Sequence, residues 1–470
     1  MGNNFLILSM KSCEINESYA TKQRKRKQKI YMFNDINFQM KKREMDRTIR
    51  YREIQWIQVH FTDLLGRLRV SYFPSKEFME DVLNTGFNFD GSSIGFVDVG
   101  KSDLIAIPDK NTFLPLPHEK NEARIIANIF DNFLKPFLAC PRYILKKAIK
   151  KMRRQGFDKI KISPEMEFYV IEKMQQKYSI HRGSAYFLPS SLDEAKTYRK
   201  ELADALRKSG YPIKYHHHEV GRNQHEVEIK ALDAMEASDF YMYFKYLAKE
   251  IAKLHNLTIT FMPKPFQDDA GNGAHMHIVL YKKDKNIFYN ENDEYNLSQT
   301  ARYFIGGILE HAPAITAIAN PTINSYKRLI AGFEAPCYIS WGRYNRSSLI
   351  RIPAKKDIDI EIRIADPAAN PYLLYAAVLH AGIDGIKKKI LYEPIEKNIY
   401  KMDEKEKREY NIKKLPSSLS EAIDELENDE ILQKAIGKDA IEMFIKEKKK
   451  EMMKYASRIT DLDYEFYFNC

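Results

Sequence analysis

Residues 159–170 read KIKISPEMEFYV, and this stretch decides the fold. Its isoleucines alternate with lysines over 159–162, which predicts a strand. If the strand continues, Glu165 and Glu167 point to the same face. Around it, helical periodicity predicts helices over residues 143–155, 192–209, 232–255, 298–319, 370–388 and 418–457. Strands alternating with long helices indicate a large α/β domain.

Upstream of this domain the predicted elements are mostly short strands. Residues 57–61 (IQVHF) alternate as a half-buried strand does, and further strands are predicted near residues 68–70, 105–107 and 123–127. The fold class is therefore predicted as α+β, with a small strand-rich domain over residues 46–140 and the larger domain over 141–470. Residues 1–45 are predicted to be a basic, disordered extension, since the run Lys22–Lys29 is almost entirely charged.

The net charge of the 470-residue chain is concentrated in that extension. The formal charge is +11, but residues 1–50 hold 12 Lys/Arg and 5 Asp/Glu, so the other 420 residues carry only +4. A nucleic-acid-binding protein would need a basic stripe on its folded surface. The composition therefore does not favour a nucleic-acid partner, although the run Lys22–Lys29 leaves contact with an acidic partner open.

The apolar content of 44% predicts a globular protein, and no apolar run is long enough to cross a bilayer. The four cysteines (Cys13, Cys140, Cys337 and Cys470) form no CxxC pair. This pattern favours a reducing, cytoplasmic location and argues against a cysteine-based zinc site.

Two motifs carry carboxylates and imidazoles at strand spacing. Glu165 and Glu167 repel each other unless a cation or a proton lies between them. Residues 216–228 (HHHEVGRNQHEVE) contain four His and three Glu, and a turn at 221–223 would fold them into a hairpin that joins Glu219 and Glu226. Such donors suit Mg²⁺ or Mn²⁺ better than zinc. Solvated carboxylates on a strand edge remain the simpler alternative.

A glycine-rich loop and a set of arginines complete the candidate site. Residues 271–277 (GNGAHMH) let backbone N–H groups approach a ligand, and His275 and His277 share a face if the segment is a strand. Arginines recur from Arg328 to Arg363, and guanidinium groups bind carboxylates and phosphates bidentately. Simple salt bridges or phosphate binding without catalysis remain alternatives. No GxxxxGK[ST] motif occurs. The residues alone therefore indicate a metal- and phosphate-using enzyme.

These motifs, in this order, resemble glutamine synthetase of the bacterial and archaeal type over about residues 52–470. The segments that carry the resemblance are residues 90–96 (DGSSIGF), 320–353 (NPTINSYKRLIAGFEAPCYISWGRYNRSSLIRIP) and 366–373 (DPAANPYL). The resemblance implies an N-terminal β-grasp domain, a C-terminal catalytic domain, and a cytoplasmic homododecamer of two hexameric rings with active sites between neighbours. It implies ATP-dependent ligation of ammonia to the γ-carboxylate of glutamate through a γ-glutamyl phosphate, with ATP, glutamate and ammonium as substrates.

The resemblance also assigns site residues. Two divalent ions, Mg²⁺ or Mn²⁺, would each have three ligands: Glu167, Glu219 and Glu226 for one, and Glu165, His275 and Glu361 for the other. Glutamate would contact Gly271, Arg328, Glu334, Arg346 and Arg363. Asp90 would bind ammonium from the adjacent subunit, and Glu334 would close over the intermediate. The ATP side would hold Lys214, His277, Val279, Arg346 and Arg351. Tyr400 resembles an adenylylated tyrosine of some members, but an ordinary loop tyrosine is the preferred interpretation.

The chain departs from the family pattern near the predicted nucleotide. Lys214 stands where an acid is usual, Val279 replaces a serine, and residues 221–223 (GRN) replace a segment like Ala-Pro-Gly. Ala270 occupies the usual place of an asparagine, which here is displaced to Asn272. Three hypotheses follow: a working glutamine synthetase, a γ-glutamyl ligase for another amine, and a catalytically impaired regulatory paralogue. Intact Asp90 favours the first, the Gly271-Asn272 order the second, and Lys214 with Val279 the third.

Overall fold

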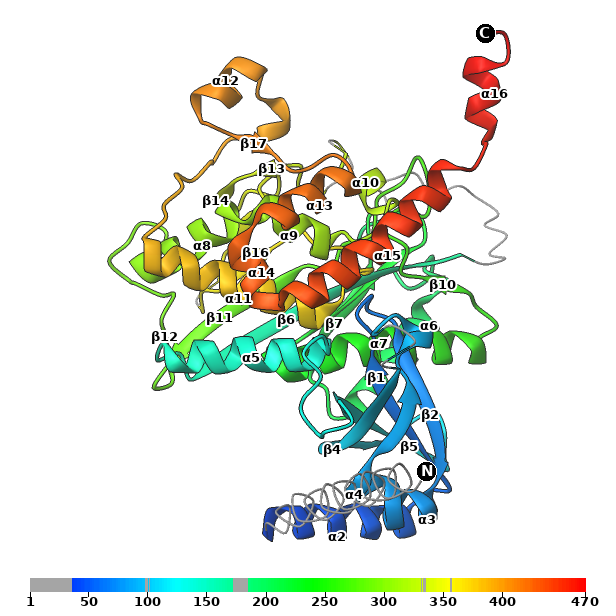
Figure 1. The fold of residues 1–470 in the computed structure, drawn as a ribbon. Coiled ribbons are helices and arrows are strands. Elements are labelled where there is room, and N and C mark those ends of the chain that lie inside the picture. The colour runs from blue at the N-terminus through cyan, green and yellow to red at the C-terminus, as the bar shows by residue number, and fades with distance from the viewer. Residues whose placement is uncertain are drawn as a thin grey trace, which may run out of the picture. The chain divides into compact units, whose positions relative to one another are not determined.

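The computed structural model describes residues 36–97, 100, 102–171, 185–330, 332, 335–355 and 357–470 (Figure 1). The chain divides into two compact units: one holds the chain up to Phe61 and Arg69–Phe137, and the other holds Thr62–Leu68 and Leu138–Cys470. Most of the predicted extension over residues 1–45 lies outside the described residues. From Ile36 onward its last part is not a disordered segment but belongs to helix α2, where Met45 and Ile49 are buried.

The first unit is built on a five-stranded sheet in the order β2-β1-β5-β4-β3, and β1 pairs in parallel with β5. Ile57, Val59 and Ile125 are completely buried, because alternate residues of β1 and β5 face the core. Its elements are α2 (Ile36–Tyr51), β1 (Trp56–Thr62), β2 (Leu68–Pro74), α3 (Ser75–Glu77), the π-helix η1 (Phe78–Val82), α4 (Leu83–Thr85), β3 (Phe87–Asp90), the 3₁₀-helix η2 (Ser92–Ile94), β4 (Asp103–Pro115) and β5 (Glu122–Phe130).

The second unit is organised by a larger sheet in the order β14-β15-β16-β11-β6-β8-β7; the short strands β9 and β10 also pair with β6, and β12 pairs with β11. Residues 159–170 (KIKISPEMEFYV) form the central strand β6. The strands are β6 (Lys159–Val170), β7 (Ile213–His218), β8 (Gln224–Ile229), β9 (Leu232–Asp233), β10 (Ile259–Thr260), β11 (Met276–Lys282), β12 (Lys285–Asn286), β14 (Trp341–Arg343), β15 (Ile350–Ile352) and β16 (Ile360–Ile362). A separate two-stranded sheet pairs β13 (Tyr338–Ile339) with β17 (Lys413–Lys414).

Helices cover one face of this sheet, and the residues packed between the helices and the sheet form the core. On β6 the even-numbered residues Met166 and Phe168 are completely buried, and the Phe168 ring lies 6.2 Å from that of Phe244 on α7 (Ala234–Leu254). The buried Asp239 of α7 accepts two hydrogen bonds from Arg142 of α5 (Pro141–Arg154), each of 3.0 Å, and therefore links these two helices. The odd-numbered residues of β6 point to the opposite face, where the polar motifs gather.

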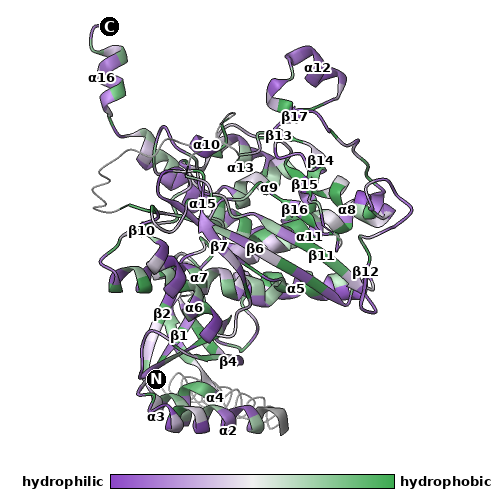
Figure 2. Ribbon diagram, turned by 180° about the vertical axis from the view of Figure 1, so that it is seen from behind, coloured by the Kyte–Doolittle hydropathy of each residue, from purple (hydrophilic) through white to green (hydrophobic). Residues whose placement is uncertain are grey.

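Helix α11 (Pro371–Lys388) packs against α5, α7, α8, α9 and α14, and α13 packs against α9. Helix α12 is coloured hydrophilic in Figure 2. The helices are α5 (Pro141–Arg154), α6 (Lys196–Lys208), α7 (Ala234–Leu254), α8 (Gln299–Glu310), α9 (Ala312–Ala319), α10 (Ser325–Arg328), α11 (Pro371–Lys388), the 3₁₀-helix η4 (Ile399–Lys401), α12 (Glu404–Glu409), α13 (Leu419–Asn428), α14 (Glu430–Ile436), α15 (Lys438–Ala456) and α16 (Asp461–Tyr467). Within the part of the chain that the structure describes, every helix is too short or too polar to cross a membrane.

Two of the predicted long helices are interrupted. The helix expected over 298–319 breaks at His311 into α8 and α9, with Pro313 in the first turn of the second helix. The helix expected over 418–457 is three helices. Asp429 leaves the helical region and caps α14 through its carboxylate, and Gly437 has φ +108°, which only glycine adopts readily. Apolar periodicity continues across both breaks, so it did not reveal them.

The first break carries a buried ionisable link. His311 Nδ1 lies 2.6 Å from Asp429 Oδ2, and its Nε2 lies 3.2 Å from Asp384 Oδ2, which also pairs with Lys388. Burial alone would lower the pKa of His311, but the two carboxylates raise it above the model-peptide value of about 6.5. The charged link should therefore stabilise the fold fully below pH 6.5, and this contribution should be lost as pH rises through the raised pKa.

We accordingly expect the free energy of unfolding to fall between pH 6 and pH 9 by more in the unmodified chain than in His311→Gln. Urea titrations at several pH values measure both slopes. Parallel pH profiles for the two proteins would contradict the assignment.

Candidate functional site

The acidic and histidine motifs project from one face of the second unit's sheet. Glu165 and Glu167 on β6 lie opposite Glu228 and Glu226 on β8, and His217 on β7 lies opposite Glu226. On the other side of β6, His277 on β11 lies between Ser163 and Glu361 in the register. Directly opposed residues of antiparallel strands share a face. The predicted hairpin of β7 and β8 is confirmed, with its turn closed by a 3.1 Å bond from Gln224 N to Gly221 O.

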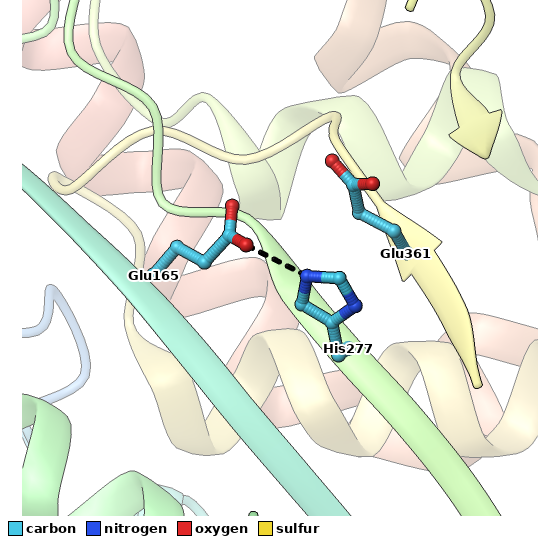
Figure 3. Close-up of side chains that lie close together, drawn as sticks. All are labelled: Glu165, His277 and Glu361. Atoms are coloured by element: carbon cyan, nitrogen blue, oxygen red, sulfur yellow. Dashed lines mark hydrogen bonds and ion pairs between the residues drawn. The ribbon is translucent and has the colours of Figure 1, made fainter. Parts of the chain in front are cut away.

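The first cluster of possible metal ligands consists of Glu165, His277 and Glu361, whose ligand atoms lie within 4.8 Å of one another (Figure 3). His277 Nε2 is 2.7 Å from Glu165 Oε1. The sequence prediction named His275 in place of His277. His275 is also at this cluster, with Nδ1 3.1 Å from Glu165 Oε2 and 3.9 Å from Glu361 Oε1. Both imidazoles therefore contact the same carboxylate.

The second cluster consists of His217, Glu219 and Glu226, again with ligand atoms within 4.8 Å. His217 Nε2 is 2.9 Å from Glu219 Oε1. The prediction had named Glu167 with these two glutamates and gave His217 no role, although strand alternation places His217 and Glu219 on one face. In the structure Glu167 Oε2 accepts hydrogen bonds from Gly273 N at 2.6 Å and from Gln224 Nε2 at 2.9 Å.

The carboxylates repel one another strongly in their buried setting. Burial and four neighbouring glutamates raise the pKa of Glu226 well above its usual range. Burial, followed by Glu219, raises the pKa of Glu167 to about 8. Burial acts in the same direction on Glu165, but His277 and His275 overcome it and lower the pKa of Glu165. Such a donor set fits a bound divalent cation, because hard oxygen ligands bind Mg²⁺ and Mn²⁺ and a cation removes the repulsion.

A cavity of about 760 Å³ lies over this face. Its lining includes Glu165, Glu167, Glu219, Glu226, Glu228, His217, His275, Gly271, Gly273, Arg328, Arg343, Arg346, Arg351 and Arg363. A Cβ at Gly271 would lie 2.6 Å from Arg328 Cγ and 2.7 Å from Pro263 O, so only glycine fits there. We call the glutamates of this lining the carboxylate wall and its arginines the guanidinium wall. Together they can hold cations against anionic substrates.

The arginines are held by their surroundings. Arg328 is buried and donates to Ile364 O at 3.2 Å. Arg363 Nε lies 3.2 Å from Glu361 Oε1, and Arg351 also pairs with Glu361. The simple salt bridges that the sequence left open therefore exist. They also link the guanidinium groups to a carboxylate of the first metal-ligand cluster.

The structure shows the surroundings of two residues that the resemblance assigns to the nucleotide side. Lys214 is not an isolated reversed charge, because its ammonium group pairs with Glu228, which is buried and lines the cavity. The family usually has an acidic residue at position 214, and in this chain the nearby acidic residue is Glu228 on the neighbouring strand β8. Val279 is buried on β11 opposite Lys161 and, like Lys214, is not part of the cavity lining.

The altered loops have structural partners. Gly221 is required, because a Cβ there would lie 2.0 Å from Tyr169 Oη, and Arg222 Nε lies 3.2 Å from Asp269 Oδ2. The carbonyl of Ala270 accepts a 2.8 Å bond from Tyr169 Oη. The displaced Asn272 is completely buried and donates to Met262 O at 2.9 Å. Its side chain therefore supports the loop.

Three further predicted residues remain, namely Asp90, Glu334 and Tyr400. Asp90 belongs to the first unit, where Ser92 and Ser93 donate hydrogen bonds to its carboxylate and lower its pKa to about 2. Glu334 lies outside the described residues. Tyr400 is half-buried, lines the cavity and donates a 2.6 Å hydrogen bond to Ala335 O.

Sequence reasoning missed an aromatic group at the cavity. Tyr186 and Tyr215 line it, and their ring centroids lie 5.4 and 5.7 Å from that of His217. The Phe187 ring lies 4.6 Å from His217. On β7, alternation from His217 to Tyr215 is a signal that could have found one of them.

Comparisons with known proteins identify the family. A family model described as glutamine synthetase, catalytic domain, matches residues 138–467, and one described as glutamine synthetase, beta-Grasp domain, matches residues 53–132. A glutamine synthetase of Pyrococcus abyssi is 42% identical over 436 residues, which cover 89% of this chain and 97% of that relative. A glutamine synthetase of Thermus thermophilus is 37% identical over 439 residues, covering 91% of this chain and 98% of the relative.

Solved structures agree with this result. The chain is similar to Plasmodium falciparum glutamine synthetase, with a TM-score of 0.81 and 29% identity over 91% of this chain and 98% of that one. It is also similar to GmaS in complex with ADP, with a TM-score of 0.84 and 30% identity over 90% and 99% of the two chains. The predicted β-grasp and catalytic architecture and the predicted ligase reaction are confirmed. The chain belongs to the glutamine synthetase family, and it is an ATP-dependent ligase that forms glutamine from glutamate and ammonia.

Proposed function

We propose that the cavity over β6 is where this ligase phosphorylates the γ-carboxylate of glutamate and then exchanges phosphate for ammonia. The observation that carries the proposal is that six glutamates and the arginines Arg328, Arg346 and Arg363 line one cavity. Phosphoryl transfer depends on positioning and charge neutralisation, which opposed carboxylate and guanidinium walls supply. Ammonia is the acceptor, since the glutamine synthetases of Pyrococcus abyssi and Thermus thermophilus are 42% and 37% identical over most of the chain.

Two divalent cations, Mg²⁺ or Mn²⁺, would be held at the two ligand clusters, with His275 added at the first cluster and Glu167 at the second. We assign Glu167, Glu219 and Glu226 to one, with His217 beside them, and Glu165, His275 and Glu361 to the other. The buried and mutually repelling carboxylates support this assignment. When bound, the cations neutralise phosphate and carboxylate charge.

The chain's own residues would orient the organic substrates. The backbone at Gly271 and the guanidinium of Arg328 would hold glutamate, whose α-carboxylate suits a bidentate arginine contact. Arg346 and Arg363 would bind the γ-carboxylate and the transferred phosphoryl group, and Arg351 the ATP phosphates. Glu334 would cover the intermediate, and Asp90 of a neighbouring copy would bind ammonium and accept its proton.

The role of Asp90 requires assembly, so we propose a homo-oligomer and retain the dodecamer of two hexameric rings as its predicted form. We also propose the domain limits 46–140 and 141–470 and a cytoplasmic location. Light scattering of the purified chain measures the copy number, and a monomer that turns over at full rate would contradict the assignment of Asp90.

The direct test of function is ATP-dependent phosphate release with glutamate, with and without ammonium, in the presence of Mg²⁺ or Mn²⁺. Phosphate release and glutamine formation should both require ammonium. Methylamine and ethylamine serve as comparison acceptors. Faster turnover with an amine than with ammonium would contradict the proposed acceptor, and ATP binding without turnover on any acceptor would indicate a regulatory paralogue.

A further inference from the structure

A group of basic side chains lies between helices α5 and α11 and has no role in the reaction assigned above. Lys147 and Lys151 are one turn apart on α5, and His380 and Lys387 are two turns apart on α11. The two helices pack against each other, and Lys151 Nζ lies 3.0 Å from His380 Nδ1. Lys147 and Lys387 are near enough to act electrostatically on the imidazole. We call these four residues the basic cluster, and none of them lines the cavity over β6.

The contact between Lys151 and His380 fixes the chemistry of the imidazole. A lysine ammonium group has only N–H donors, so His380 Nδ1 accepts and the ring proton is on Nε2. His380 is 7% exposed, and burial, followed by Lys151, Lys147 and Lys387, lowers its pKa to about 3. The ring is therefore neutral at physiological pH and presents Nε2–H as a donor. Within the described residues, this nitrogen has no hydrogen-bond partner.

The basic cluster holds donors and positive charge but no acceptor that could balance them. Among the described residues, none of its three lysines forms an ion pair with a carboxylate. Asp384 lies one turn beyond His380, but its Oδ2 lies 2.8 Å from Lys388 Nζ and 3.2 Å from His311 Nε2. Burial, followed by Lys387, lowers the pKa of Lys151, although Asp384 acts in the opposite direction. A bound anion would remove the repulsion between these cations and accept from the imidazole.

We propose that the basic cluster binds a phosphate group, either as free phosphate or as part of a larger phosphate-bearing molecule. Lysine binds phosphate as a compact point charge, and ammonium groups that converge from two helices suit an anion with several oxygens. A planar carboxylate is matched better by the fork of an arginine, and the basic cluster contains none. The site is separate from the carboxylate and guanidinium walls, and it adds to the proposed function without depending on it.

The test follows acetylation of individual lysines by peptide mass spectrometry, in EDTA and without metal, while phosphate replaces chloride at constant ionic strength. Without phosphate, Lys147 and Lys151 should react readily, because their lowered pKa leaves more of each amine neutral. Phosphate should protect Lys147, Lys151 and Lys387 with one common midpoint. Lys146, which is exposed on the same helix, should not be protected. A second series uses ADP, and a lower midpoint for ADP than for phosphate would identify the ligand as a larger phosphate-bearing molecule.

A charge-removing variant and a matched control decide whether the protection comes from the basic cluster. Lys387→Gln should raise the midpoint for Lys151 at least about tenfold, since a hydrogen bond to a charged group is lost. Lys146→Gln removes the same charge from α5 outside the basic cluster and should leave the midpoint unchanged. Urea unfolding in EDTA checks that both variants fold.

Three results would overturn the inference: no protection by phosphate or ADP, equal protection of Lys146, or an unchanged midpoint in Lys387→Gln. Because the labelling contains no metal and involves no turnover, these results do not bear on the proposed function. Loss of glutamine formation would in turn leave the phosphate site intact, so the two proposals fail independently.

Discussion

Glu226→Gln is expected to abolish glutamine formation and to make the protein without metal more stable. Glu226 is almost completely buried, and its four charged neighbours are Glu165, Glu167, Glu219 and Glu228. Removing one negative charge from this group relieves repulsion when no cation is bound. The same change removes a proposed ligand, and we expect turnover to fall by more than the loss of about 10–100-fold typical of an outer-shell carboxylate.

Thermal unfolding with and without Mn²⁺ separates the two effects. A cation at 100 times its dissociation constant stabilises the folded chain by about 2.7 kcal/mol. We expect this gain in the unmodified chain and a much smaller one in Glu226→Gln. The control Glu409→Gln, which changes an exposed glutamate of α12, should retain the gain and full activity. Metal-dependent stabilisation that survives in Glu226→Gln would remove Glu226 from the metal centre.

The second large effect is expected at the ion pair of Lys214 and Glu228. Lys214→Glu places a second carboxylate against Glu228, which is only 4% exposed and lines the cavity beside the proposed metal ligands. A buried charged group that loses its partner costs about 1–3 kcal/mol or more, and the new like charge adds to this. We expect lower stability and at least a tenfold rise in the KM for ATP.

The double variant Lys214→Glu/Glu228→Lys restores an opposite-charge pair on the same two strands. It should recover most of the stability lost in Lys214→Glu, and the interaction energy from the double-mutant cycle should be clearly favourable. Lys161→Glu, which changes a lysine paired with the exposed Asp233, is the control and should have a small effect. Additive effects of the two single substitutions would show that the pair is not energetically coupled.

Strand alternation predicted much of the carboxylate wall. The placement of Glu165 and Glu167 on one face follows from the period of a strand, and the β7–β8 hairpin follows from polar strand pattern on both sides of Gly221. Alternation does not predict which strand pairs with β6 on the edge opposite β8. The pairing of β11 with β6 and β16 decided that His277, as well as His275, contacts Glu165.

Charge partners were the least predictable feature. Lys214 looked like a reversed charge at the nucleotide because its partner Glu228 lies on another strand, and the pair exists only through the β7–β8 pairing. The helix breaks at His311 and Gly437 were missed for a related reason. Apolar periodicity reports which face is buried, and that face continues across a short interruption.

By itself, the sequence determined the residue types of the site, the strand period that aligns its acids, and the resemblance that implied family, reaction and substrates. These properties depend only on the order of residues along the chain, which can be read from the sequence. Only the tertiary structure decided which donors converge: His217 with Glu219 and Glu226, His277 between Glu165 and Asp359, and Glu228 against Lys214. Convergence depends on strand register, because a shift of one residue turns every side chain to the other face.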